Sequence, residues 1–225
     1  MRALMKLALL AVVVTLATGA FAQTFAVKGG LNLSTMVMKD NDDTYSDDLK
    51  LNPGFHAGIT AEFPIAGVFS LETGALLSTR GFRIQEKETF EGGPFEIKET
   101  MNLYYLEVPV TGKFTFDAGG VKINGAIGPY VGVGLTGNVK AKASYQGETE
   151  KDEAAIHWGS DEENDDFLRG DFGVTIGGGV EINAFRVGVS YALGLANISP
   201  YTEDGFTVSN NVLGISVGYV FFRNK

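Results

Sequence analysis

The sequence predicts an all-β protein, an eight-stranded antiparallel up-and-down transmembrane β-barrel with four long external loops and three short periplasmic turns. Three observations predict it. Bulky apolar residues alternate with small or polar ones in stretch after stretch, the pattern of strands with two different faces. The connections between these stretches alternate long and short, as in membrane barrels. Glycine supplies 30 of the 225 residues, which suits a narrow barrel interior.

The N-terminus predicts a cleaved secretory signal peptide. A basic start is followed by the apolar residues 7–16 and by a small-x-small cleavage site, Ala20-Phe21-Ala22. The apolar segment is shorter than the roughly 20 residues that a helical span needs, which argues against an N-terminal anchor. We therefore expect cleavage after Ala22, leaving residues 23–225 as one barrel domain in the outer membrane.

Composition limits the classes of function. The chain has no cysteine, so no disulfide holds the fold together. Its formal net charge is −9, and removal of Arg2 and Lys6 makes it −11. This acidity disfavours nucleic acid as a partner and also disfavours attraction to anionic phosphates. We expect a monomer surrounded by outer-membrane lipid, without cofactor or metal.

The expected strands follow one another with clear interruptions. In order they cover residues 24–34, 55–63, 69–84, 104–116, 121–135, 168–182, 186–195 and 211–222. The first alternates Val27 and Leu31 outward with Lys28 and Asn32 inward. After the acidic stretch 39–50, the second ends at a connection of about four residues, so the third must return antiparallel.

The third strand continues past Arg80 into Phe82 and Ile84. The polar stretch 86–98 separates it from the fourth strand, and the Asp117-Ala118-Gly119-Gly120 turn joins the fourth to the fifth. The longest interruption, residues 138–167, is rich in Asp and Glu and shows no sustained alternation. We expect it to be a flexible external loop with little that could pack.

The last two strands close the barrel. A tight turn at Asn183-Ala184 leads from the sixth strand to the seventh, and the polar stretch 197–209 precedes the eighth. In the eighth strand bulky residues at odd positions from Leu213 alternate with mostly small ones at even positions up to Phe222. Six phenylalanines of outward parity are expected near the short-turn rim as an aromatic girdle: Phe25, Phe63, Phe69, Phe114, Phe116 and Phe221.

A soluble, lipocalin-like barrel is the main alternative fold. Such a barrel needs a water-facing exterior of Lys, Glu, Gln and Asn. Here the less apolar face consists mainly of Gly, Ala, Ser and Thr, which suits an eight-stranded lumen just wide enough for side chains. The membrane barrel is therefore favoured.

At three places the chain resembles a known family. The segments are Val27-Lys28-Gly29-Gly30-Leu31-Asn32-Leu33-Ser34, Tyr104-Tyr105-Leu106-Glu107-Val108-Pro109-Val110 and the closing Gly218-Tyr219-Val220-Phe221. Together they resemble the PorT-type outer-membrane β-barrel proteins, which are similar in architecture to the OmpA and OmpX barrels. The closing strand also resembles the assembly signal of such barrels, although Arg223, Asn224 and Lys225 follow the aromatic. The resemblance implies fold and compartment but no particular activity.

Charged residues of inward parity predict an ion-pair network that fills the lumen, because unpaired charges there would be costly. They are Lys28, His56, Glu62, Glu72, Arg80, Glu107, Lys113, Lys122, Arg169, Asp171, Glu181 and Arg186. With Asn183 and Ala184 as turn residues, Glu181 faces Arg186 across the hairpin, and we expect these two to pair.

Neither catalysis nor metal binding is predicted. Some eight-stranded barrels act on membrane lipids with a His, a Ser and an acid, but His157 and Ser160 do not have the His-x-Ser spacing of the deacylase barrels, and His56 faces inward. The acidic loops lack the spacing of a calcium loop and are better explained as solvated charge.

The function expected from the sequence is structural or interaction-based. We expect a small outer-membrane barrel that presents mobile acidic loops to an extracellular or cell-envelope protein partner. The alternatives are a passive pore, which eight strands disfavour, and an enzyme that modifies outer-membrane lipid.

Overall fold

The computed structural model describes residues 23–224 except 47–48, 91–92 and 146–147. The predicted cleavage site after Ala22 therefore lies outside the described residues. The described part contains a short 3-10 helix and ten strands: β1 (Thr24–Lys39), β2 (Asn52–Ala66), β3 (Phe69–Arg80), β4 (Arg83–Phe90), β5 (Gly93–Asp117), β6 (Val121–Tyr145), β7 (Glu148–Ala155), β8 (Gly170–Ile182), β9 (Phe185–Gly194), η1 (Glu203–Gly205) and β10 (Thr207–Arg223). None of its helices is long and apolar enough to cross a membrane.

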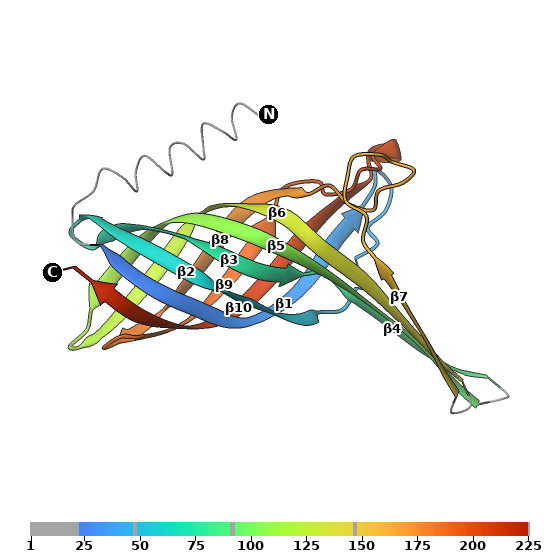
Figure 1. Ribbon diagram of the computed structural model, residues 1–225, viewed down its shortest axis with the longest axis horizontal. Coiled ribbons are helices and arrows are strands. Elements are labelled where there is room, and N and C mark those ends of the chain that lie inside the picture. Colours follow the sequence, from blue (N-terminus) through green and yellow to red (C-terminus); the bar gives the residue numbers. More distant parts are fainter. Residues whose placement is uncertain (1–22, 47–48, 91–92, 146–147, 225) are drawn as a thin grey trace.

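Eight of the strands close into a ring, which confirms the predicted barrel (Figure 1). The order around the ring is β1-β2-β3-β5-β6-β8-β9-β10, every neighbouring pair is antiparallel, and β10 pairs with β1 along its whole length. Closure leaves no free edge in the ring, so the backbone N–H and C=O groups of the wall are paired between strands. This pairing is what a β-structure needs in order to cross a bilayer.

The two faces of the wall differ as the alternation predicts. Outward side chains are apolar and exposed, for example Leu31 at 61% and Val217 at 62%. Inward neighbours such as Asn32 and Ser34 are at most 2% exposed. Apolar side chains exposed in a continuous band would be unfavourable in water and are explained by contact with lipid.

The three short turns lie at one end of the barrel, and each contains a residue with positive φ. Gly67 has a φ of 54°, Gly119 and Gly120 have 74° and 97°, and Asn183 has 56°. Glycine and asparagine tolerate this left-handed conformation better than other residues do. Turn chemistry therefore explains why the chain reverses in so few residues at these places.

Aromatic rings gather at the turn end. Phe69 lies 5.1 Å from Phe114 and Phe25 lies 6.4 Å from Phe221, measured between ring centroids. These four belong to the girdle that the sequence predicts. A further pair, Phe185 with Tyr219 at 5.3 Å, was not in that prediction. Rings at this level suit the membrane interface.

The other two strands extend the wall beyond the ring and correct a prediction. Residues 86–98 and 138–167 were expected to be loops, but β4 pairs with the start of β5 and β7 pairs with the end of β6. Because β5 and β6 also pair there, β4, β5, β6 and β7 form a four-stranded sheet that leaves the barrel at a slant on the side away from the turns (Figure 1). We call residues 83–90, 93–100, 138–145 and 148–155 the external sheet.

The third strand is also shorter than predicted. It ends at Arg80, and Gly81 with a φ of 133° lies between β3 and the start of β4 at Arg83. Phe82 keeps the inward parity of Arg80 and is only 4% exposed. At this point the chain leaves the barrel ring for the external sheet.

A bulge alters the end of the closing strand. Phe25 pairs with Phe222 whereas Ala26 pairs with Val220, so Phe221 is an extra residue in β10. Because one extra residue reverses the alternation, Phe222 is exposed beside Phe25 instead of facing inward as predicted. The same shift turns Arg223 into the barrel.

Candidate functional site

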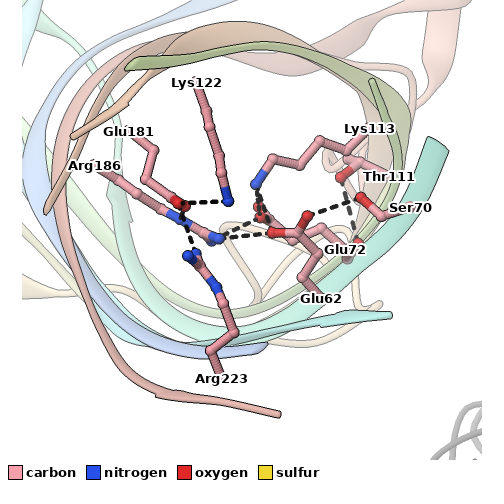
Figure 2. Close-up of polar contacts among 9 residues, drawn as sticks. All are labelled: Glu62, Ser70, Glu72, Thr111, Lys113, Lys122, Glu181, Arg186 and Arg223. Atoms are coloured by element: carbon pink, nitrogen blue, oxygen red, sulfur yellow. Dashed lines mark hydrogen bonds and ion pairs between the residues drawn. The ribbon is translucent and has the colours of Figure 1, made fainter. Parts of the chain in front are cut away.

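The lumen is the only place where the sequence predicted a cluster of functional groups, and near the turn end it holds an ion-pair network (Figure 2). Arg186 is at its centre. Its Nε donates to Glu181 Oε2 at 2.8 Å, its Nη2 donates to Glu62 Oε2 at 2.7 Å, and its Nη1 lies 3.4 Å from Glu72 Oε2. The predicted pairing of Glu181 with Arg186 is therefore confirmed, with the two in direct register across β8 and β9.

Lys113, on β5, is a second cation that pairs with the carboxylates of this network. Its Nζ donates to Glu62 and to Glu72, at 2.8 Å in each case. The Ser70 hydroxyl donates to the second oxygen of Glu62 at 2.9 Å. The two inward carboxylates, from β2 and β3, thus lie between Lys113 of β5 and Arg186 of β9.

Glu181 is shared by three cations. Besides Arg186, Arg223 Nη2 donates to its Oε1 at 2.6 Å, and Lys122 Nζ lies 3.5 Å from the same oxygen. Sequence reasoning missed Arg223 because strict alternation would place it outside. The bulge in β10 is what brings it in, so Arg223, directly after the closing aromatic, belongs to the lumen network.

A second network lies nearer the external end and is centred on Arg80. Its guanidinium donates to Glu107 and to Asp171, and also to the Tyr130 hydroxyl at 3.0 Å. The side chains of Arg80 and Asp171 are fully buried. Asn210 donates to Asp171 at 2.9 Å, which further satisfies that carboxylate. Buried charges of this kind require partners, and within the described residues only Arg80 Nε and Asp171 Oδ1 of these two side chains are left without a hydrogen bond.

Aromatic rings enclose this second network. The guanidinium carbon of Arg80 lies 4.6 Å from the ring centroid of Tyr130 and 5.0 Å from that of Tyr105. Cation–π contact stabilises a buried arginine, while the rings fill the cross-section of the barrel. Tyr105 and Tyr130 are each at most 1% exposed.

Between the two networks lies a cavity of about 150 Å³. His56 and Lys28 line it. The Nδ1 atom of His56 is 2.7 Å from Asn32 Oδ1, and its Nε2 has no hydrogen-bond partner among the described residues. In the part of the chain that the structure describes, Lys28 has no carboxylate within 4 Å. Polar and apolar side chains both line this cavity, and charged residues of the two networks, among them Arg186 and Glu107, also border it.

The external mouth is closed by apolar side chains. Residues from β1, β5 and β10 and from the connections between strands pack together there, and we call this cluster the apolar plug: Met36, Phe82, Met101, Leu103, Tyr105, Ile156, Phe167, Ala196, Ile198 and Val208. Leu103, Met36 and Ile198 have no exposed surface. The segment 156–167, expected to have little that could pack, therefore contributes to a core.

The two histidines lie in different environments. His56 is buried in the lumen, whereas His157 lies in the connection after β7 with a side chain that is 73% exposed, 3.5 Å from Asp166. No contact in the described residues joins His157 to Ser160. The acidic connections likewise show no group of three or more His, Cys, Asp or Glu residues that could hold a metal ion, within the residues described.

Arg169 is the one predicted lumen charge that belongs elsewhere. It precedes β8 and donates to the carbonyl of Gly134 at 2.9 Å, with its guanidinium carbon 5.9 Å from the ring centroid of Trp158. Arg169 therefore links β6 to the connection that contains Trp158. It takes no part in either lumen network.

Comparison with known proteins places these features in context. A family model described as "Outer membrane protein beta-barrel domain" matches residues 21–199, which include β1 to β9. A comparison with curated proteins gave no match.

Three solved structures are similar to the chain over most of its length. Ail, the attachment invasion locus protein of Yersinia pestis, has 16% sequence identity and a TM-score of 0.38, over 89% of this chain and 100% of Ail. Neisserial surface protein A has 12% identity and a TM-score of 0.40, over 88% and 97% of the two chains. OprG from Pseudomonas aeruginosa has 12% identity and a TM-score of 0.36, over 90% and 98%.

Proposed function

The chain belongs to the family of outer membrane protein β-barrel domains, and we propose that it is a structural or interaction protein that presents its external sheet and acidic loops to a protein partner. The partner would be an extracellular or cell-envelope protein. The barrel itself would be a monomeric, non-conducting anchor without catalytic activity, cofactor or metal.

The observation that carries this proposal is the distribution of structure along the barrel axis. The lumen is filled at three levels, by the network around Arg186, the network around Arg80 and the apolar plug. Outside the ring, by contrast, four strands continue as an ordered sheet with paired backbones. A filled interior suits anchoring better than transport, and an external sheet suits contact with other molecules.

The passive pore is the weaker alternative. Water-filled channels belong to barrels of about 16 to 18 strands, and eight strands leave an interior just wide enough for side chains. The cavity beside His56 does not by itself make a path through the barrel, because fully buried Arg80 lies on its external side.

A lipid-modifying enzyme is weaker still. Such an enzyme would need a nucleophile and a base within hydrogen-bond reach at the membrane face. Neither the contacts of His56 nor those of His157 supply that pair in the described residues.

Within the family we further propose the PorT-type group. The opening strand from Val27 to Ser34, the strand around Glu107 and the closing strand support it. In the structure these segments are parts of β1, β5 and β10, which lie in the barrel wall.

The proposal is tested by cross-linking on intact cells that express the full chain or a variant lacking Glu148–Ala155. Proteins captured by the full chain and lost with the variant would support presentation by the external sheet. Both chains must show the same heat-modifiable gel mobility, which reports an intact barrel. If capture is identical with and without β7, the external sheet is not the presenting element.

A further inference from the structure

The external sheet separates its charges onto two faces. Partners in register share a face, so the pairings of β4 with β5, β5 with β6, and β6 with β7 assign each side chain. One face carries every arginine and lysine of the sheet together with two acids: Arg83, Lys87, Lys98, Lys140, Lys142, Lys151, Glu96 and Glu153. The opposite face carries five acids among the described side chains: Glu86, Glu99, Glu148, Glu150 and Asp152. We call these the basic face and the acidic face.

Three lysines lie side by side in the middle of the basic face. Lys98 is directly opposite Lys142, and Lys142 is directly opposite Lys151. Like charges in direct register destabilise a sheet, so this row favours a bound anion. On the acidic face the acids are separated instead, since Glu99 and Asp152 both face Ala141, and Glu150 faces Ala143.

The two acids of the basic face do not neutralise this row. Glu96 is 3.5 Å from Lys87 and Glu153 is 3.5 Å from Lys140, so each acid forms its ion pair with a lysine outside the row, while the charge of Lys142 acts on Glu96 only from a greater distance. Lys98, Lys142 and Lys151 have no carboxylate within 4 Å in the described part of the chain. Lys142 and Lys151 are also exposed, which leaves them accessible to an external anion.

The basic face is continuous with the lipid-facing wall. Strand β5 runs from Gly93 to Asp117 without interruption, so Lys98 is on the same side as Tyr104 and Leu106, the latter 45% exposed to lipid. In β6 the partners of Tyr104 and Tyr105 are Thr136 and Gly134, and this irregularity moves the outward side from odd to even positions. Lys140 and Lys142 therefore also continue the outer wall.

We propose that the basic face binds phosphate groups of the outer-leaflet lipid that surrounds the barrel. Its position just beyond the apolar band, on the external side, is the level of the lipid headgroups. The external sheet slants away from the ring (Figure 1). Because its outward face continues the outer wall of the barrel, this slant would turn that face toward the surrounding membrane surface. The net charge of the chain is negative, but its separation onto two faces leaves a locally basic surface where the lipid lies.

Lipid is a better occupant of this surface than a soluble anionic ligand. A soluble ligand would not need the face that continues the lipid-facing wall, whereas a headgroup reaches no other. Each lysine near an anionic membrane surface contributes about five-fold in affinity, equivalent to about 1 kcal/mol. The row of three lysines thus predicts a preference for anionic over zwitterionic lipid on the order of 100-fold. The acidic face remains free for the protein partner, so this inference and the proposed function can fail separately.

The absence of cysteine allows a direct test with a donor fluorophore on a single introduced thiol. Ser144→Cys places the donor on the basic face and Ala143→Cys places a matched donor on the acidic face. The full chain is reconstituted in phosphatidylcholine vesicles with a trace of acceptor-labelled phosphatidic acid or acceptor-labelled phosphatidylcholine. For the donor at position 144, we expect energy transfer to phosphatidic acid to exceed transfer to phosphatidylcholine. For the donor at position 143, we expect a smaller difference.

Matched charge variants assign the effect to the lysine row. The variant Lys98→Gln/Lys142→Gln/Lys151→Gln should lose the preference, and Glu99→Gln/Glu150→Gln/Asp152→Asn should keep it. Raising the salt from about 0.1 M to about 1 M shortens the Debye length from about 10 Å to about 3 Å and should reduce the preference. If the triple lysine variant does not fold, Lys142→Gln alone removes the centre of the row and should weaken the preference about five-fold.

Three results would overturn the proposal. The first is equal transfer to both lipids from position 144. The second is a preference that survives in a folded lysine variant. The third is loss of the preference when inorganic phosphate, or a soluble acidic polypeptide, is added at the concentration of the lipid phosphate, because the site would then serve soluble anions.

Discussion

Replacing Arg80 tests the importance of the filled lumen for stability. Arg80 donates to two carboxylates, Glu107 and Asp171, and to the Tyr130 hydroxyl. Methionine has a similar length but no charge, so Arg80→Met keeps much of the packing and leaves both carboxylates without their cation.

The expected loss can be estimated from burial. The side chains of Arg80 and Asp171 are fully buried, and that of Glu107 is 12% exposed. Removing one partner of a buried ion pair costs about 3–5 kcal/mol because the remaining charge is uncompensated. Lys140→Met is the matched control, since its pair with Glu153 is more than half exposed and such pairs contribute at most about 1 kcal/mol.

The assay is urea unfolding of the barrel in lipid vesicles, followed by the fluorescence of Trp158, the single tryptophan. Its ring is 5.7 Å from that of Tyr105 and so reports on the apolar plug. The triple variant Arg80→Met/Glu107→Gln/Asp171→Asn should recover at least half of the loss, because it removes the uncompensated charges. If Arg80→Met lowers the free energy of unfolding by less than about 1 kcal/mol, as the control does, the buried network around Arg80 does not stabilise the barrel.

Three further predictions follow from the structure. Deleting residues 143–166 should still permit membrane insertion but should lower the unfolding midpoint, because the deletion removes part of the apolar plug. Deleting residues 213–222 should prevent insertion, because it opens the ring. Gel mobility and protease protection measure the insertion of both variants, and an inserted barrel without the closing strand would contradict the prediction. The hydrogen bond to Asp40 raises the pKa of Tyr45 to about 12, so the stabilisation that this bond gives the first loop is complete below pH of about 10 and is lost as the pH rises through about 12. In a phenolate absorbance titration, Asp40→Asn should lower the pH at which Tyr45 ionises, and an unchanged pH of ionisation would exclude the contact. Gly128→Val should destabilise the barrel, since a Cβ there would lie 2.2 Å from the carbonyl oxygen of Val110. The control is Ile127→Val, at the adjacent, outward-facing position. Equal urea midpoints of the two variants would contradict the close approach of the Gly128 and Val110 backbones.

The wall of the barrel was predictable because every strand has lipid on one face and a crowded lumen on the other. This difference fixes side-chain parity, and parity together with a two-residue turn was enough to pair Glu181 with Arg186. The same logic failed where a single residue is inserted. The bulge at Phe221 reverses the faces of Phe222 and Arg223, and the sequence has no separate mark for it.

The external sheet was missed because neither of its faces is buried. Residues 148–155 are all exposed, so no apolar alternation identifies β7 as a strand. A weaker signal was present in β6, where Lys140-Ala141-Lys142-Ala143-Ser144 alternates polar and apolar residues. The apolar plug escaped prediction for a different reason: Ile156 and Phe167 lie in segments without sustained alternation, and the fold brings them into one cluster.

The closed lumen is the central claim, and planar-bilayer recording of the pure protein tests it most directly. With the networks around Arg186 and Arg80 and the apolar plug in place, the barrel should show no steady conductance across the bilayer. A stable, voltage-insensitive conductance from the pure protein would contradict it and would make the chain a pore.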